Sequence, residues 1–266
     1  MANEHCLHCP SRVPSLARRL YSVWYRHIRV YGRHLVSNGL PPFLEPLFFL
    51  AGIGLGMGAQ LAPVNSVPYL GFLAGGMLAP AAMYTAAFEC TYGTFERLMV
   101  DKVYDGMLGA SISESDLIIG ELLFVGTKGF FFTTSVLLVL TPFGLVTWPE
   151  VLLAPFVGFA TGVMFGAMGL VITSLVSTIS QFNIFMTGFL TPMFFFSGMV
   201  FPLANIPADF RWLAEALPLT HAVRLVRAAA LARPEAGMLF SLVYCLAFCI
   251  LFSWLAVLLL RRRLRS

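Results

Sequence analysis

Charged side chains are scarce in this sequence. Only 11% of its 266 residues are Asp, Glu, Lys or Arg, whereas 58% are apolar and the mean hydropathy is +0.82. Because a soluble domain carries about 25% charged residues, this composition excludes an ordinary water-soluble fold. It predicts an all-α integral membrane protein with room for about six spans of about 20 residues each.

Sequence motifs of the common enzyme classes are also missing. There is no G-x-x-x-x-G-K-[ST] phosphate loop, no His-Glu-x-x-His pair and no G-x-S-x-G elbow. His221 and Asp209 share one segment, but they do not form a convincing hydrolytic set. We therefore expect a protein that is not an enzyme. If it is an active pump, another chain must hydrolyse the ATP.

Cysteine is too sparse for a secreted disulfide framework. Cys90, Cys245 and Cys249 fall in or near apolar segments, and Cys6 and Cys9 lie in an N-terminal tail, residues 1–13. The tail has thiolate and imidazole side chains that can bind zinc. No second ligand cluster accompanies them, so we favour a disordered tail and predict no metal site.

Positive charge gathers at the two ends of the chain. Six arginines precede the first apolar run and four follow the last: Arg12, Arg18, Arg19, Arg26, Arg29 and Arg33, then Arg261, Arg262, Arg263 and Arg265. Lys and Arg next to spans favour the cytoplasmic side, so both termini are predicted to be cytoplasmic and the number of spans to be even. Four arginines between 211 and 233 then lie outside, which the rule tolerates because it is a bias.

Six apolar segments have the length of spans. They cover 43–62, 70–90, 119–140, 151–173, 181–201 and 237–260. Residues 14–40 precede them as an interfacial amphipathic helix and its connector, which Pro41 and Pro42 are predicted to end. Small residues four apart predict close helix packing in spans one and four: Gly52, Gly54, Gly56 and Gly58, then Ala154, Gly158, Gly162 and Gly166.

The largest polar segment between spans is 91–118. Apolar residues from Phe95 to Val103 are spaced as one face of a short helix. Such a helix suits docking to a soluble partner, and a solvated loop with a local interfacial helix explains the pattern equally well. The residues assigned to this contact are Phe95, Glu96, Arg97, Leu98, Val103 and Tyr104.

The segment 202–234 is too apolar for a loop and too often interrupted by proline for a span. Irregular backbone at membrane depth is tolerated only where protein or a water-filled cavity surrounds it. We therefore predict a re-entrant hairpin on the outer side, with helices over 208–216 and 220–230. Arg224 and Arg227 are three residues apart and are expected to contact headgroups, phosphates or Glu215.

Four ionisable residues lie in or near the spans, and such residues are usually paired or line a path. Glu45, Glu89 and Glu121 are placed at cytoplasmic span ends, and Lys128 shares a face with Glu121. They either surround an inner mouth or only pair and pack. Phe194, Phe195 and Phe196 at the outer end of span five either touch a cargo or face lipid. No carboxylate is placed at mid-membrane, which disfavours a proton-coupled carrier.

Several motifs occur in a familiar order: T-F-E-R-L, Y-D-G-M-L-G, G-E-L-L, F-F-F-S-G-M-V-F-P-L-A-N-I-P and L-P-L-T-H-A-V-R-L-V-R. From Leu16 to the C terminus the chain resembles the permease subunits of type-2 ABC exporters. Within that class it is most similar to the NodJ type, which exports nodulation lipo-chitooligosaccharides.

The resemblance implies two permease copies and two separate ATP-binding subunits, with ATP and Mg held by those partners and no cofactor on this chain. It implies a coupling helix near 94–107, outer helices that close the exit, and a path bordered by spans one, two and five. The implied outer gate comprises Phe201, Pro202, Asn205, Pro207, Trp212, Pro218, His221, Arg224 and Arg227.

The expected location is the bacterial inner membrane, in contact with lipid and without nucleic acid. The expected cargo is an amphiphilic lipid-linked saccharide. An exporter of an amphipathic drug or antibiotic in the same class is the nearest alternative. A membrane scaffold without transport is a third.

Overall fold

The computed structural model describes residues 14–56, 63–64, 67–110, 112–233 and 237–265. These residues are almost entirely helical, with one isolated bridge between Val64 and Val67. Cys6 and Cys9 lie outside the described residues, as do residues 57–62 of the first predicted span.

The α-helices have the following bounds: α1 Leu16–Arg33, α2 Leu35–Gly39, α3 Pro41–Gly56, α4 Tyr69–Phe88, α5 Val103–Leu108, α6 Glu114–Leu140, α7 Ala154–Leu175, α8 Phe182–Phe185, α9 Thr191–Phe196, α10 Ala208–Ala216, α11 Pro218–Leu231 and α12 Met238–Arg265. Turns of π-helix cover Glu89–Gly93, Glu96–Val100 and Met186–Leu190. Short 3₁₀ turns cover Thr141–Phe143, Glu150–Leu153, Ile179–Gln181 and Leu203–Asn205.

Five helical stretches of the described chain are long and apolar enough to cross a membrane: Tyr69–Val100, Glu114–Phe143, Glu150–Leu175, Ile179–Phe196 and Met238–Leu264. They fall where spans two to six are predicted. The described part of span one is α3, which has 16 residues, so a sixth crossing stays a prediction.

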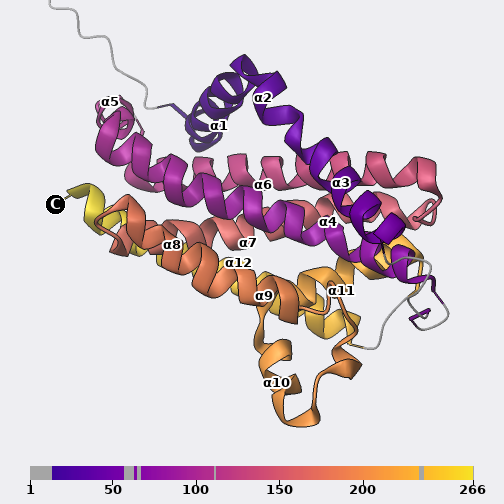
Figure 1. Cartoon of the computed structure of the whole chain (residues 1–266). Helices are drawn as coiled ribbons and strands as arrows, with labels where there is room; N and C mark the ends of the chain where they lie inside the picture. The colour runs from indigo at the N-terminus through magenta and orange to yellow at the C-terminus, as the bar shows by residue number, and fades with distance from the viewer. Residues whose placement is uncertain (1–13, 57–62, 65–66, 111, 234–236, 266) are drawn as a thin grey trace, which may run out of the picture.

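The long helices lie side by side, as Figure 1 shows. The central elements α4, α6 and α7 contact one another, and α12 packs on α7. One end of the bundle carries α5 and the C terminus, and the opposite end carries α11 and the turn after α6. The backbone N–H of Thr147 in that turn donates to the carbonyl of Ala230 at 2.7 Å.

The glycine stripe of α7 lets α6 approach closely, as its spacing predicts. A Cβ atom on Gly162 would lie 2.7 Å from the carbonyl oxygen of Val125, and one on Gly129 would overlap the backbone of Gly158. Gly52 and Gly56 of α3 differ, because an added Cβ would meet nothing within 4 Å. Gly52 and Gly56 are therefore in close contact with no other element of the described chain.

The N-terminal helix is amphipathic as predicted, and it packs along the first half of α6. Val23 is buried, the Trp24 indole donates to Thr127 at 3.0 Å, and Arg19 pairs with Asp116 at 3.3 Å. Pro41 and Pro42 do not end this helix, which stops at Arg33. They begin α3 instead. Proline is tolerated there because the backbone N–H groups of the first helical turn have no hydrogen-bond partner within the helix.

The segment after α9 contains two helices at the positions that the prolines predict. Pro207 precedes α10, and Pro218 begins α11. The two differ in setting: α11 packs against α4, α7 and α12, whereas α10 projects from the body of the molecule (Figure 1).

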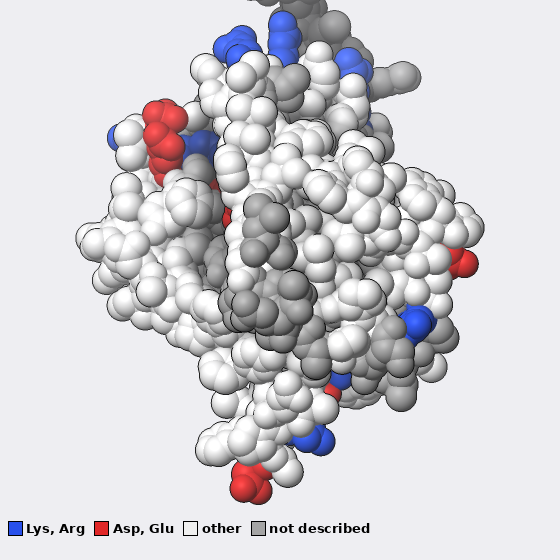
Figure 2. All heavy atoms as spheres, turned by 45° about the vertical axis from the view of Figure 1, so that its right-hand side comes forward, with Lys and Arg blue, Asp and Glu red and all other residues white. Residues whose placement is uncertain are grey.

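The lateral surface is that of an integral membrane protein. Figure 2 shows one face on which charged side chains are sparse and lie mostly toward its margins. Large apolar side chains of α12 are exposed, including Leu239 at 74% and Ile250 at 71%. In water these side chains would be costly to expose, so we assign this surface to lipid.

We expect Gly162→Ala to destabilise the helix bundle, because its Cβ must push α6 away from α7. The cost expected of such overpacking is about 1–3 kcal/mol. Thermal unfolding in detergent measures it as a lower Tm, and Gly52→Ala is the matched control. An unchanged Tm for Gly162→Ala would contradict the close packing of these helices.

Candidate functional site

A cavity of about 740 Å³ opens between α3, α4, α6 and the segment at the end of α9. Its lining includes four predicted path residues, Glu45, Glu89, Lys128 and Phe194, together with Glu96. Aromatic side chains form much of the remaining wall: Phe49, Tyr84, Phe88, Tyr92 and Phe132.

The polarity of the cavity changes along its length. On α4 and its continuation the lining runs from Met77 to Glu96, a rise of about 28 Å at 1.5 Å per residue. The charged residues Glu89 and Glu96 lie toward one end of this run, whereas Met77 and Ala81 lie toward the other. The cavity therefore offers a charged end and an apolar end.

The α4 helix continues as π-helical turns through Val100. The sequence predicts a separate short helix across Phe95–Tyr104, and the structure corrects this. No proline interrupts residues 89–100, so nothing stops the helix there. It ends at Val100 with Asp101 as its C-cap, after which Lys102 adopts a left-handed conformation (φ 49°) and α5 begins. Residues 91–108 are thus an extension of a span followed by a short return helix.

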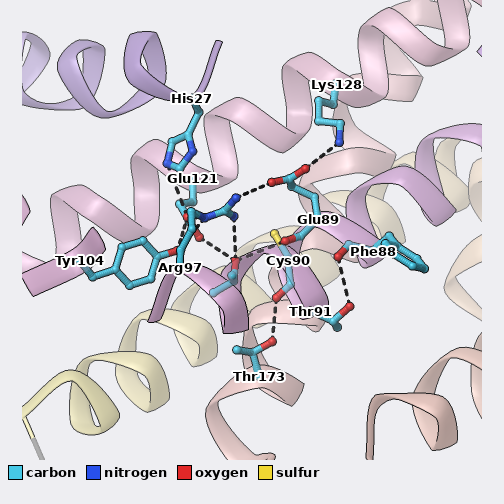
Figure 3. Close-up of polar contacts among 11 residues, drawn as sticks. His27, Phe88, Glu89, Cys90, Thr91, Arg97, Tyr104, Glu121, Lys128 and Thr173 are labelled. Atoms are coloured by element: carbon cyan, nitrogen blue, oxygen red, sulfur yellow. Dashed lines mark hydrogen bonds and ion pairs between the residues drawn. The ribbon is translucent and has the colours of Figure 1, made fainter. Parts of the chain in front are cut away.

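Arg97 lies between two glutamates at the centre of a largely buried polar cluster. Its Nη1 is 2.6 Å from Glu89 Oε1, and its Nε is 3.2 Å from Glu121 Oε1. Figure 3 shows the guanidinium between the two carboxylates, which come from the continuation of α4 and from α6. Thr94 donates to the second oxygen of Glu121 at 3.0 Å and accepts from Arg97 at 3.2 Å.

Lys128 completes the cluster on the side of the cavity. Its ammonium lies 2.7 Å from Glu89 Oε2 and 4.9 Å from the centre of the Tyr31 ring. The sequence places Lys128 on the same face of its helix as Glu121, but the carboxylate that Lys128 contacts is that of Glu89. Lys128 and Glu121 are seven residues apart, a rise of about 10.5 Å along α6, so they share a face but are too far apart for direct contact.

Tyr104 extends the cluster toward the exposed end of the bundle. It is fully buried on α5, and its hydroxyl donates to Glu121 Oε1. Burial, and then the negative charge of Glu121, raise the pKa of Tyr104 well above its ordinary value. The phenol therefore stays protonated and keeps donating. A continuous set of polar contacts thus joins α5 to the cavity.

His27 belongs to the same cluster, and the sequence analysis missed it. The side chain is 3% exposed, and its Nε2 is 3.5 Å from Glu121 Oε1, where the geometry makes no hydrogen bond. Burial lowers the pKa of His27 to about 4, so the ring is neutral at pH 7. Its spacing of four from Val23 and Tyr31 gives it a place on the packed face of α1.

Glu121 does not line the cavity with Glu45 and Glu89. It is 1% exposed and contacts Arg97, Tyr104 and His27 on the other side of the cluster. A ring formed by all three glutamates around one mouth is therefore not what the structure has. Phe195 and Phe196 also lie apart from the cavity lining and are about half exposed.

The other residues that the sequence assigned to the partner contact differ in their exposure. Phe95 is buried against the ring of Phe182, with ring centres 5.6 Å apart, whereas Glu96 is exposed. Leu98 and Val103 are partly buried. Phe95 is therefore a packing residue of the bundle rather than part of an exposed docking face.

The predicted gate residues of α11 are held by its neighbours. His221 contacts the Glu215 carbonyl at 2.9 Å and Ser241 Oγ at 3.1 Å, and Arg224 pairs with Glu215 at 2.5 Å. These contacts join α10, α11 and α12. The expected contact of Arg224 with Glu215 is therefore present.

Arg227 points into the protein. It is 7% exposed, stacks on the Phe72 ring at 3.8 Å, and donates to the carbonyl of Gly198 at 2.9 Å. A contact with headgroups is excluded for this side chain by its burial. Of the other predicted gate residues, Pro218 is buried, Phe201 and Pro202 are partly buried, and Asn205, Pro207 and Trp212 are exposed.

The family is decided by the comparison with known proteins. A sequence model described as ABC-2 type transporter matches residues 18–231. The chain belongs to the ABC-2 transporter family. It is therefore a transport subunit, and its polar cluster and cavity are those of an ABC-2 permease.

Several relatives of this ABC-2 permease carry the name Nodulation protein J. That of Sinorhizobium fredii is 35% identical, over 92% of this chain and 94% of the relative. That of Rhizobium leguminosarum bv. viciae is 33% identical, over 91% and 94%. The inner membrane transport permease YadH of Escherichia coli is 22% identical, over 77% and 79%. The resemblance to NodJ-type permeases is thereby confirmed.

Arg97→Gln should destabilise this permease strongly, because it leaves Glu121 buried without its arginine partner. Breaking a buried ion pair on one side costs about 3–5 kcal/mol. The double variant Arg97→Gln, Glu121→Gln removes both charges and should lose less than Arg97→Gln alone. Thermal unfolding of the three proteins measures this, and a double variant as unstable as the sum of the two single variants would argue against direct pairing.

Stability should also fall as the pH drops from about 6.5 toward 4. The unfolded state binds a proton on His27 in this window whereas the folded state resists it, so acid favours unfolding. The shift in pKa corresponds to about 3 kcal/mol. His27→Gln should flatten this part of the pH profile, with His34→Gln as the control. If the stability of wild type and of His27→Gln changed identically with pH, the claim that His27 is buried in its neutral form would be wrong.

Proposed function

We propose that this ABC-2 permease is the membrane subunit of an ATP-driven exporter that moves an amphiphilic lipid-linked saccharide out across the bacterial inner membrane. The cavity between α3, α4 and α6 carries this proposal. Its charged end suits a hydrated sugar, and its aromatic and apolar end suits stacking on sugar rings and contact with an acyl chain.

The proposed topology has both termini in the cytoplasm and six spans, the first formed by α3 together with residues 57–62. The end of the bundle with α5 is then cytoplasmic, and α10 and α11 lie on the outer side. Arg18, Arg29 and Arg33 of α1 are exposed and Arg26 is half-buried on this cytoplasmic side, which agrees with the preference of basic residues for it.

The proposed partners are two ATP-binding subunits, which hold ATP and Mg, and a second copy of this permease. The docking surface on this chain is the turn between the α4 extension and α5. Met99 and Val100 are 50% and 63% exposed, and Asp101 and Lys102 are exposed beside them. This surface replaces the one that the sequence centred on Phe95.

The polar cluster is the proposed connection between that docking surface and the cavity. Movement of α5 displaces the hydroxyl of Tyr104 from Glu121, and Glu121 shares Arg97 with Glu89. Glu89 and Lys128 both line the cavity. Closure of the ATP-binding subunits would therefore change the charged end of the cavity through contacts that already exist.

The proposed outer gate is formed by α10 and α11. Arg227 on α11 donates to the carbonyls of Gly198 and, at 3.3 Å, Met199. Met199 lines the apolar end of the cavity. Displacement of α11 would therefore move Met199 and change the apolar end of the cavity, where the cargo would leave.

The export function is tested in vesicles that contain the permease and its co-purified ATP-binding subunit. Addition of a lipo-chitooligosaccharide should stimulate ATP hydrolysis. The lipo-chitooligosaccharide itself should then be transferred across the vesicle membrane. Ala81→Trp fills the cavity and should reduce transfer about tenfold, whereas Ala51→Trp, on the exposed side of α3, should not. If amphipathic drugs stimulated ATP hydrolysis and the saccharide did not, the cargo would be a drug rather than a lipid-linked saccharide.

The docking surface is tested by Met99→Asp together with Val100→Asp. Both side chains are exposed, so the permease should still fold, but the ATP-binding subunit should bind about tenfold more weakly in a pull-down titration. Val36→Asp, at a position of α2 that is 80% exposed, is the control. Undiminished binding by the double variant would place the partner elsewhere.

A further inference from the structure

A second hollow lies away from the cavity described above. It is an apolar groove of about 550 Å³ between the last turns of α7, the α8 region and α12. Apolar side chains form almost all of its lining: Met168, Val171, Ile172, Leu175, Val176, Ile184, Phe185, Phe189 and Phe252, with Gln181 as the polar member. Ile184 and Leu175 are 75% and 67% exposed. The groove is therefore open at the lateral surface.

A polar hollow of about 450 Å³ adjoins this groove, and Leu175 and Val176 line both. Its other lining residues are Ser174, Ser177, Leu259, Arg262 and Arg263. No carboxylate is among the described residues that line it. Two guanidinium groups and two hydroxyl-bearing residues make this hollow suited to an anion.

Arg263 is fixed in position by the end of α7. Its Nη1 donates to the carbonyl of Thr173 and, at 2.5 Å, to that of Val176. The C-terminal carbonyls of a helix attract cations, so this contact closes α7 and holds α12 beside it. The neighbouring Arg262 is exposed at the hollow, whereas Arg261 is turned to Glu114 at 3.3 Å. A positive site is thus built at the mouth of an apolar groove.

The dimensions match one leaflet of a bilayer. Phe252 in the groove and Arg262 in the polar hollow are ten residues apart on α12, a rise of about 15 Å. The hydrocarbon core of a bilayer is about 30 Å thick, so the groove reaches from the arginines to about mid-membrane. This is the length over which one acyl chain extends below its phosphate.

We propose that the apolar groove and the adjoining polar hollow form one site for an anionic glycerophospholipid, with its phosphate at Arg262 and Arg263 and an acyl chain along α7, α8 and α12. Basic pockets between membrane helices bind anionic headgroups in this way. Which leaflet supplies the lipid follows from the proposed orientation of the permease. The site itself uses no residue of the export cavity.

A lipid fits both hollows better than the other anions that Arg262 would accept. Inorganic phosphate or glycerol phosphate would fill the polar hollow and leave the groove exposed. An acidic surface of a partner protein would reach Arg262, but not the groove residue Phe252, about 15 Å deeper along α12. The continuity of the two hollows at Leu175 and Val176 therefore favours an amphiphile.

The site is tested by native mass spectrometry of the full chain released from nanodiscs that contain equal amounts of phosphatidylglycerol and phosphatidylcholine. Wild type should retain phosphatidylglycerol in preference. Arg262→Gln should reduce that preference about tenfold, as expected for a charge-assisted contact with phosphate. Arg18→Gln removes the same charge from an exposed position on α1 and should change the preference less than twofold.

A second variant tests the groove without changing charge. Leu175→Trp fills the junction of the two hollows and should displace the lipid, and excess glycerol phosphate should not displace it from wild type. Displacement by glycerol phosphate alone would reduce the site to a phosphate site. Equal retention of the two lipids, or equal effects of Arg262→Gln and Arg18→Gln, would overturn the proposal. The proposal would also be overturned if Arg262→Gln left lipid retention unchanged but abolished binding of the ATP-binding subunit. That result would assign the polar hollow to the ATP-binding subunit.

Discussion

The structure depends on a set of four charges that balance one another, of which Glu121 is buried and the other three are partly buried. Glu89 and Glu121 are compensated by Arg97 and Lys128, and Arg97 lies within 3.2 Å of both carboxylates. Removing one member leaves an uncompensated buried charge, which costs more than the pair itself contributes. Glu89 and Arg97 come from the continuation of α4, and the other two residues come from α6. The arrangement therefore requires α4 to extend beyond the apolar part of its span.

The position of this cluster explains the shape of the end of the bundle that carries α5. The π-helical turns carry Arg97 to Glu121, and the left-handed Lys102 then returns the chain so that Tyr104 reaches the same carboxylate. On the opposite side α1 covers the cluster with His27 and Tyr31. A contiguous set of contacts couples two sites only if it has two arrangements, and the shared Arg97 provides a group that can change partners.

Much of the fold follows from the sequence, because hydropathy and helix periodicity are local signals. The spans after the first, the amphipathic Leu16–Arg33 and the glycine stripe of α7 are all visible in the pattern of residues. The prolines likewise indicate where α10 and α11 begin. These features need no knowledge of which helices are neighbours.

The polar contacts of the site could not be predicted in the same way, because they depend on neighbours distant in sequence. Lys128 pairs with Glu89, 39 residues away, although Glu121 is nearer in sequence and on the same face. Arg227 is three residues from Arg224 and is expected from this spacing to contact the same groups, but it is buried against Phe72. The extension of α4 was hidden by polar residues that resemble a loop, since their charges are satisfied only in the assembled bundle.

The central claim is that the charge cluster transmits nucleotide state from the docking surface to the cavity. Phe48 of α3 and Phe195 of α9 are exposed and are sequence neighbours of the lining residues Phe49 and Phe194. Spin labels at these two positions measure the distance between the two elements by pulsed electron resonance in the complex with the ATP-binding subunit. We predict that a non-hydrolysable ATP analogue shifts this distance in wild type and leaves it unchanged in the charge-balanced variant Arg97→Gln, Glu121→Gln. An equal shift in both proteins would contradict the account.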